Sequence, residues 1–256
     1  MPDLLKKTSP EPLQVYSDTD VTEIVENASL FLDQAVQYQE LMMMYDCAIK
    51  EVRTKLEVLN SEFSVRYQRN PIEFISSRIK KPVSIVRKMR QRGLPLTFSS
   101  LEQNLNDVAG IRVICSFIDD IYAVADMLIR QDDVTLLEKK DYIKSPKENG
   151  YRSLHLIVEI PVFFSDHKRD MKVEVQIRTI AMDFWASLEH QLKYKKSIED
   201  EEEIIKELRE CADTIAATDA RMLSIRNRIH TSPNREAAKE DDPIIRYEKI
   251  QIPFGH

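Results

Sequence analysis

The sequence predicts an α+β protein in which a mixed β-sheet is flanked by helices. Residues 171–179, MKVEVQIRT, alternate apolar and polar side chains, as expected for a half-buried strand. Further strand patterns at 111–117, 134–143 and 153–164 surround a helical pattern at 120–130, for which Asp119 and Asp120 are expected to form the N-cap. A strand, a helix and then a meander give a sheet that contains both parallel and antiparallel pairs.

Helical patterns precede this sheet. They run from Val21 to about Tyr67, and apolar residues spaced by four and three form one stripe: Tyr45, Ile49, Val52, Leu56, Leu59 and Phe63. Pro71 and Pro82 are expected to open two short helices. After Gly93 and Pro95 a linker should lead to the first strand of the sheet.

Two more helices are expected after the sheet, at 181–196 and from about 200 to 230, the second with apolar residues recurring over 205–229. The core domain is therefore placed at 21–230, between flexible ends at 1–20 and 231–256. One small sheet covers only part of the apolar stripes at 45–63 and 205–229. A homo-oligomer that buries the remainder is expected.

Composition describes a globular chain. It is 43% hydrophobic and 31% charged, with a net charge of −6. Its apolar runs are shorter than a membrane span needs, and its polar first residues carry no secretory pattern. A cytoplasmic location without membrane contact is the resulting expectation.

Two carboxylates stand beside arginines and short apolar strands. Asp107 lies in NDVAGIRVICSF (106–117), and Glu174 lies in the alternating strand at 171–179. Carboxylates on rigid strands suit Mg²⁺, and flanking cations suit phosphate charge, so the pattern is typical of metal-assisted phosphoryl transfer. Taken alone, the strand with Glu174 is equally well explained as a sheet edge with a solvated polar face.

A turn-rich segment, SPKENGYRSLH (145–155), carries polar groups suited to a nucleotide. The chain has only four glycines, so Gly150 is expected to serve a particular backbone geometry. Tyr151 would be an exposed ring for base stacking, with Lys147 and Arg152 near enough to meet phosphates. A tyrosine that closes a hairpin core is the alternative.

The third cluster is basic. Between Arg66 and Arg92 there are nine basic residues and one acidic residue, in a chain that is acidic overall, which indicates a phosphate-rich ligand. Lys80, Ser84 and Lys88 are spaced by four, so a helix would place them on one side. Pro82 is expected to open that helix and to leave Arg78 and Lys80 on the strand or loop leading into it, beside an N-terminus that attracts anions. A solvated helix face is the alternative.

In this order, DVAGIRV, PKENGYRSLH, EVQIRT and AMDFWASLEHQLKYK resemble the synthetase domain of the RelA/SpoT alarmone family, specifically its small single-domain members. The resemblance covers about residues 40–230. It implies a nucleotidyltransferase fold related to polymerase β and the synthesis of ppGpp and pppGpp, the alarmones of the stringent response, by transfer of pyrophosphate from ATP to the 3′-hydroxyl of GDP or GTP. It also favours a tetramer.

The resemblance also implies roles for individual residues. ATP would be bound by Arg78, Lys80, Ser84, Lys88 and Arg112, with Arg78 and Arg112 on the two faces of the adenine. Asp107 matches the Mg²⁺ ligand, and Glu174 matches the second carboxylate, a metal ligand and base. Tyr151 would stack on guanine, and the acceptor pocket would be completed by Lys140, Lys147, Asn149 and His155. Asp183 falls where the guanine edge would be read, or it is only a charge at a helix N-terminus.

Other functions fit parts of the pattern. A non-catalytic nucleotide or single-stranded RNA binding module would use the same cations and tyrosine, but it needs no carboxylates beside phosphates. Another nucleotidyltransferase would release pyrophosphate instead of AMP. Long relatives carry a hydrolase domain with paired His-Asp ligands, and this sequence contains no His-Asp dipeptide, so it is expected to make the product without destroying it. Five arginines exceed what ATP needs: Arg66, Arg69, Arg87, Arg90 and Arg92. They could form a second site for product or single-stranded RNA, but ordinary solvated arginines are the favoured alternative.

Overall fold

The computed structural model describes residues 18–193 and 201–230. The chain divides into two units, of which one ends at Met43 and the other begins at Met44. The second unit contains the sheet. The flexible ends expected at 1–20 and 231–256 lie outside the described residues, apart from 18–20, which belong to a helix.

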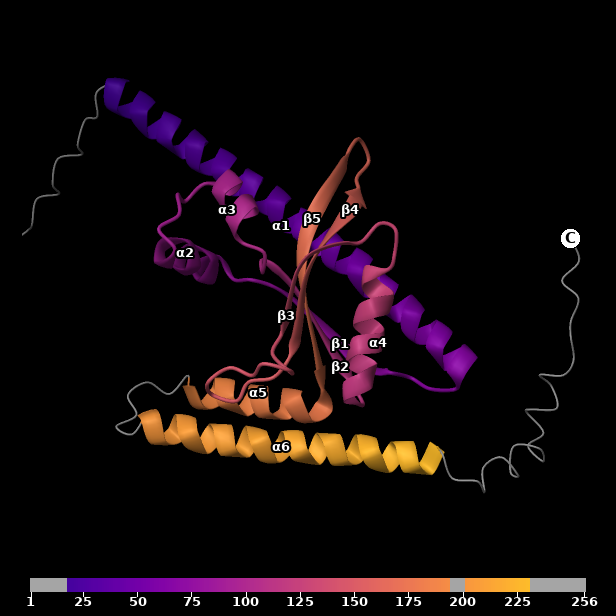
Figure 1. The fold of residues 1–256 in the computed structure, drawn as a ribbon. Coiled ribbons are helices and arrows are strands. Elements are labelled where there is room, and N and C mark those ends of the chain that lie inside the picture. The colour runs from indigo at the N-terminus through magenta and orange to yellow at the C-terminus, as the bar shows by residue number, and fades with distance from the viewer. Residues whose placement is uncertain (1–17, 194–200, 231–256) are drawn as a thin grey trace, which may run out of the picture. The chain divides into compact units, whose positions relative to one another are not determined.

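Five strands form one mixed sheet (Figure 1), in the order β1-β2-β5-β4-β3. β2 and β5 are parallel, and the other neighbours are antiparallel. The predicted mixed sheet is therefore confirmed. The strands are β1 (Ile72–Ile79), β2 (Ala109–Cys115), β3 (Thr135–Asp141), β4 (Leu154–Phe163) and β5 (Lys168–Thr179). Because β5 lies between β2 and β4, the alternative of a solvated edge strand is wrong.

The described helices are α1 (Asp18–Tyr67), α2 (Pro82–Gln91), α3 (Phe98–Asn104), α4 (Ile118–Ile129), α5 (Ile180–Lys193) and α6 (Glu201–His230). None of them is both long and apolar enough to cross a bilayer. α4 packs on β2, β4 and β5, which gives the sheet one apolar, covered face. On β5 this face carries Val173, Val175 and Ile177, all fully buried. The alternation that predicted the strand therefore separates the core from a polar face.

Three details differ from the sequence prediction. Pro71 precedes strand β1, because residues 72–79 pair with β2 along their whole length. The expected linker contains helix α3, which Thr97 caps by accepting a hydrogen bond from the backbone N–H of Ser100 at 3.2 Å. Phe117 is the N-cap residue of α4, and Asp119 and Asp120 lie in its first turn.

α6 packs along α5 (Figure 1). Trp185 on α5 donates from Nε1 to the carbonyl of Leu208 at 2.9 Å, and its ring packs in a cluster with Ala212. At the end of β5, the Thr179 hydroxyl donates to Asp219 on α6 at 2.6 Å, and it accepts from the Met182 backbone N–H. A buried carboxylate therefore holds α6 to the junction between β5 and α5.

Burial raises the pKa of Asp219, and the bond from Thr179 offsets only part of the rise. A carboxyl whose pKa is raised by folding stabilises the protein below its unfolded pKa, and this contribution is lost as the pH rises through the folded pKa. We expect Asp219→Asn to keep an acceptor for Thr179 and to melt at pH 7 no lower than the wild type. Any excess of the variant's Tm over the wild-type Tm should disappear as the pH falls toward 4, where the wild-type carboxyl is also neutral. A Tm that is lower at pH 7 and equally lower at pH 4 would contradict this account.

Candidate active site

The polar face of the sheet carries two rows of side chains that run across the strands. In one row, Arg78 on β1 is paired with Gly110 on β2, which is paired with Glu174 on β5. The second row lies two residues away from the first along each strand. It contains one polar side chain from every strand, in the order Ser76, Arg112, Gln176, His155 and Lys140. Residues two apart share a face of a strand, so the register alone gathers these groups.

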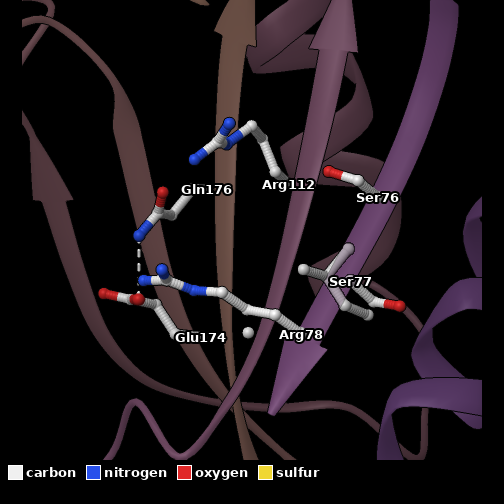
Figure 2. Close-up of a pocket in the computed structure, with 8 residues that line it drawn as sticks. Ser76, Ser77, Arg78, Arg112, Glu174 and Gln176 are labelled. Carbon is white, nitrogen blue, oxygen red and sulfur yellow. Dashed lines mark hydrogen bonds between the residues drawn. The ribbon is translucent and has the colours of Figure 1, made fainter. Parts of the chain in front are cut away.

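A cavity of about 160 Å³ opens over the part of these rows that lies on β1, β2 and β5 (Figure 2). Arg78 and Arg112 enter it from neighbouring strands, and Glu174 and Gln176 face them from β5. Gly110 lines the cavity without a side chain. A Cβ built there would lie 3.8 Å from Arg78, which is an ordinary van der Waals contact. The remaining lining residues are Ser76, Ser77 and Ile111.

Asp107 lies in the loop before β2, not on the strand, and its partners are lysines. Its Oδ2 accepts hydrogen bonds from Lys80 at 2.8 Å and Lys88 at 2.5 Å. Burial alone would raise the pKa of Asp107, but the two ammonium groups outweigh burial and hold it below the usual value. The carboxylate is therefore ionised and sits among cations that can turn toward phosphate.

The expectation that Pro82 opens a helix, with Arg78 and Lys80 on the chain leading into it, is confirmed. Pro82 does open α2, with Lys81 as N-cap residue, so Lys80 precedes the helix. The two lysines meet because both reach Asp107, not because they share a helix face. Ser84 is half-buried on α2 and is not among the residues that line the cavity.

Glu174 is held from two sides. Its Oε1 lies 3.3 Å from Nδ1 of His155, and its Oε2 accepts from the Gln176 amide at 2.9 Å. Burial and the charge of Asp107 raise the pKa of Glu174, but the contacts with His155 and Gln176 outweigh them and lower it. The charge of Asp107 therefore reaches Glu174, although a different set of residues holds each carboxylate.

A directed hydrogen-bond chain leads to Glu174. Arg178 can only donate, so the Tyr151 hydroxyl accepts from its Nη2, at 2.5 Å. The tyrosine proton is then free to donate to Nε2 of His155, 2.8 Å away. In a neutral His155 this order places the hydrogen on Nδ1, where it faces Glu174.

The loop before β4 is shaped by α6. Gly150 has φ +87°, and a Cβ there would lie 2.5 Å from Cβ of Ala212, so the expectation of a special backbone geometry is confirmed. Arg152, expected near phosphates, instead donates to Asp213 at 2.9 Å and to the Ala212 carbonyl at 3.3 Å. It is an anchor between this loop and α6. Asn149 likewise bonds within the fold, donating to Glu189 at 3.0 Å.

Tyr151 is half-buried, not exposed. Its ring packs against the cluster of Trp185, Ala186 and Ala212, and two cations lie near its centre. Nζ of Lys147 is 4.7 Å and Cζ of Arg178 is 5.0 Å from the ring centroid. Lys147 is exposed and can leave the ring, whereas Arg178 is buried. A stacked base would therefore replace Lys147.

Asp183, in the first turn of α5, contacts two arginines of the polar face, Arg112 and Arg178. Its Oδ1 accepts from Arg178 at 3.1 Å and lies 3.3 Å from Arg112. Burial and the charge of Arg178 lower the pKa of Arg112, and Asp183 counteracts them. Lys140, at the end of its row on β3, forms a 3.0 Å ion pair with Glu138. The roles of these residues toward a nucleotide remain predictions.

Four polar residues at this site were not assigned a role from the sequence: Ser76, Ser77, Gln176 and Arg178. Gln176 and Arg178 could have been found from the alternation alone, because it puts them on the face of Glu174. The position of Ser76 depends on its pairing with Arg112 across β1 and β2, which no local pattern reveals.

The carboxylates fit a hard cation. Oδ1 of Asp107 is buried and has no hydrogen-bond partner, so it offers a free oxygen. Among residues 18–193 and 201–230, no group of three or more acidic, histidine or cysteine side chains gathers around one point. Mg²⁺ is commonly held by one or two carboxylates together with substrate phosphates, and the donors present match that pattern.

Three of the five additional arginines take part in the fold. Arg66 pairs with Glu62, Arg69 pairs with the buried Asp120, and Arg92 donates to the carbonyl of Asn104 at 3.0 Å. These contacts favour an ordinary structural role for the three.

Residues 77–199 match the family described as "Region found in RelA / SpoT proteins". The GTP pyrophosphokinase YwaC of Bacillus subtilis is 42% identical over 188 residues, which cover 73% of this chain and 90% of that protein. The GTP pyrophosphokinase YjbM of the same organism is 36% identical over 193 residues, which cover 75% and 90%.

Solved structures agree. Small alarmone synthetase 1 from Bacillus subtilis, bound to its product pppGpp, has a TM-score of 0.69 and 35% identity, over 76% of this chain and 98% of that one. Small alarmone synthetase 2 from the same organism has a TM-score of 0.67 and 40% identity, over 75% and 98%. Together with the mixed sheet and the paired carboxylates, this similarity over nearly whole relatives shows that the chain belongs to the RelA/SpoT family, among the small alarmone synthetases.

Proposed function

We propose that this chain is a GTP pyrophosphokinase that transfers pyrophosphate from ATP to the 3′-hydroxyl of GTP or GDP and so makes pppGpp or ppGpp. The observation that carries the proposal is a cavity lined by Glu174 and two arginines, with a second carboxylate, Asp107, in the loop before β2, whose charge acts on Glu174. A module that only binds nucleotides or RNA has no use for carboxylates next to the phosphates, because the negative carboxylates repel the negative phosphates.

The donor nucleotide is assigned to the cavity. Arg78 and Arg112 line it from adjacent strands, and guanidinium planes stack well on a purine. Lys80 and Lys88 reach the edge of this site at Asp107, where they would neutralise the triphosphate. Ser84, on the same helix as Lys88, would add a polar contact there.

The acceptor nucleotide is assigned to the neighbouring part of the polar face. Tyr151 would stack on guanine, and Asp183 would accept hydrogen bonds from its N1–H and 2-amino group. Lys140, Lys147, Asn149 and His155 complete this wall. In support, His155 connects Tyr151 directly to Glu174, so a nucleotide held by the tyrosine lies next to a carboxylate.

Transfer of two phosphates requires attack on the β-phosphorus of ATP, with AMP as the leaving group. Glu174 would take the proton from the weakly acidic 3′-hydroxyl, provided that this oxygen comes within about 3 Å. Lys80, Lys88 and the arginines would take up charge in the transition state. Asp107 and Glu174 would hold Mg²⁺, which, when bound, supplies further positive charge to the phosphate oxygens.

The reaction is tested by incubating the protein with ATP, GTP and Mg²⁺ and separating the nucleotides by chromatography. AMP and pppGpp in equal amounts are expected. Release of pyrophosphate would indicate another nucleotidyltransferase, and unchanged nucleotides that nevertheless bind would indicate a binding module.

We expect Gly110→Ala to weaken donor binding without unfolding the protein. The new methyl group meets nothing closer than Arg78 at 3.8 Å in the empty cavity, but it takes up space in the lining between Arg78 and Glu174. Overpacking of this kind costs about 1–3 kcal/mol, so KM for ATP should rise roughly 5- to 150-fold while KM for GTP changes little. An unchanged KM for ATP in a folded variant would place the base elsewhere.

We also propose a homo-oligomer, with four subunits as the expected number. The reason given by the sequence fails in part, because the stripe on α1, from Tyr45 to Leu59, is buried within one chain. Apolar side chains nevertheless remain exposed on α5 and at the end of α6: Phe184, Leu188, Leu192, Met222, Ile225 and Ile229. A surface of this kind is commonly covered by a second subunit.

Light scattering should therefore give about four times the chain mass of 29.9 kDa. Leu192→Glu, which places a charge on this surface, should lower the measured mass. A stable monomer of the wild-type protein would contradict the proposal.

A regulatory site for the product or for single-stranded RNA remains a prediction, and the exposed Arg87 and Arg90 on α2 are the cations that would carry it. Rates that change sigmoidally with added product, and less so at high salt, would support it. A cytoplasmic location belongs to the same proposal, because the nucleotide substrates are found in that compartment.

A further inference from the structure

Arg178 is a buried arginine on the polar face of β5, with 4% of its surface exposed. Its Nη2 donates to the Tyr151 hydroxyl at 2.5 Å and to the Gln176 amide oxygen at 3.0 Å. Its Nη1 donates to Asp183 at 3.1 Å, and its Nε donates to the Ser153 hydroxyl at 3.3 Å. One guanidinium thus joins the loop before β4, the strand β5 and the helix α5.

This buried charge is costly for folding. Removing an arginine from water costs several kcal/mol, and well-packed apolar residues often replace buried ion pairs without loss of stability. The carboxylate that balances Arg178 is Asp183, whose Oδ1 also faces Arg112. One shared carboxylate therefore offsets only part of the cost of burying Arg178. We take this as a sign that the placement of the Arg178 N–H donors serves a function.

We propose that Arg178 is a positioning residue for the acceptor nucleotide, fixing the ring of Tyr151 and the carboxylate of Asp183 in one arrangement. The inference rests on the proposed function, which assigns these two side chains to guanine. Arg178 is too buried to offer the nucleotide a contact surface of its own. It acts through its partners.

The geometry gives the physical reason. The Tyr151 hydroxyl is held between Arg178 and His155, and Cζ of Arg178 lies 5.0 Å from the ring centroid, so both the position and the tilt of the ring are set before a base arrives. Side chains that are already ordered before the nucleotide arrives lose less conformational entropy on binding. Lysine cannot reproduce this, because one ammonium lacks the planar fork that reaches Tyr151 and Asp183 together.

The test compares Arg178→Lys and Arg178→Met with Arg226→Met. Arg226 is a matched control, because it is also largely buried, pairs with Asp119, and lies over the ring of Phe117, outside the proposed site. For each variant the Kd values for GDP and for the ATP analogue AMPCPP are measured by calorimetry, together with the Tm.

We expect both Arg178 variants to raise the Kd for GDP about tenfold or more, the loss typical of charge-assisted hydrogen bonds, and the Kd for AMPCPP by less than threefold. Arg226→Met should lower the Tm without a selective loss of GDP binding. If the Arg178 variants lower the Tm but leave the ratio of the two Kd values unchanged, Arg178 is only structural and the inference is wrong. If they change neither the Tm nor the ratio, the inference is also wrong.

A double-mutant cycle with Tyr151→Phe tests whether Arg178 acts through the Tyr151 hydroxyl. The single variant Tyr151→Phe also covers the case in which the Arg178 variants fold poorly. Tyr151→Phe removes the accepting hydroxyl and leaves the cation in place, so it should itself weaken GDP binding. In this background Arg178→Lys should lose part of its effect, since interacting residues are not additive. Full additivity, or unchanged GDP binding by Tyr151→Phe, would overturn the proposal. Because wild-type turnover is measured separately, failure of the reaction itself is distinguished from failure of this inference.

Discussion

Glu174→Gln and Asp107→Asn should each lower turnover by about 100-fold or more, because loss of a metal ligand or of a general base commonly costs that much. Glutamine at 174 keeps an oxygen for His155 but cannot accept a proton or hold Mg²⁺ as a carboxylate does. Asparagine at 107 keeps the shape of the side chain but loses the charge that Lys80 and Lys88 face. Initial rates of AMP release measure both effects.

Glu159→Gln is the matched control. Glu159 lies on the polar face of β4, one row beyond Glu174, where it is paired with Lys172 on β5. It should keep near wild-type turnover, since it lies outside the cavity. Tm values separate lost chemistry from lost folding. More than a tenth of wild-type turnover in a variant at 107 or 174 with a normal Tm would remove that residue from the mechanism.

The strand with Glu174 was predictable because its signal is local. Alternation over 171–179 follows directly from the geometry of a strand, and it correctly separates Val173 and Val175 from Glu174. Pro82 likewise marks a helix start through its fixed φ and its missing N–H. The mixed order of the sheet followed from the sequence of elements, because α4 lets β3 run in the direction of β2, and the meander β3–β4–β5 then makes β5 parallel to β2.

The partners of individual charges were not predictable in the same way. Asp107 and Arg112 are neighbours in sequence, yet Asp107 pairs with lysines 27 and 19 residues away. Arg152 resembled a phosphate ligand until α6, 60 residues later, placed the carbonyl of Ala212 beside it. Such contacts depend on how distant segments pack, and local spacing contains no information about that. Similarity to a family can anticipate a role, but it does not give the hydrogen bonds that orient the side chain.

Tyr151→Ala should raise KM for GTP far more than KM for ATP, by an amount on the order of 1–3 kcal/mol, the value typical of a base stacked on an aromatic ring. The structure adds a second contribution, because the ring also packs on Trp185 and holds His155 through its hydroxyl. Tyr151→Phe separates the two. Phenylalanine keeps the stacking surface and the packing, so it should lose only the part that depends on the hydroxyl and lie between the wild type and alanine.

Calorimetry with GDP and AMPCPP checks this without turnover, and the Tm shows how much of the loss comes from the cluster around Trp185. The order wild type, Phe, Ala in GDP affinity, with AMPCPP affinity nearly constant, is the expected result. If alanine weakens both nucleotides equally, the ring supports the fold and guanine is bound elsewhere. If phenylalanine is as damaging as alanine, the hydroxyl and its bonds to Arg178 and His155 carry the effect, and stacking on Tyr151 does not contribute.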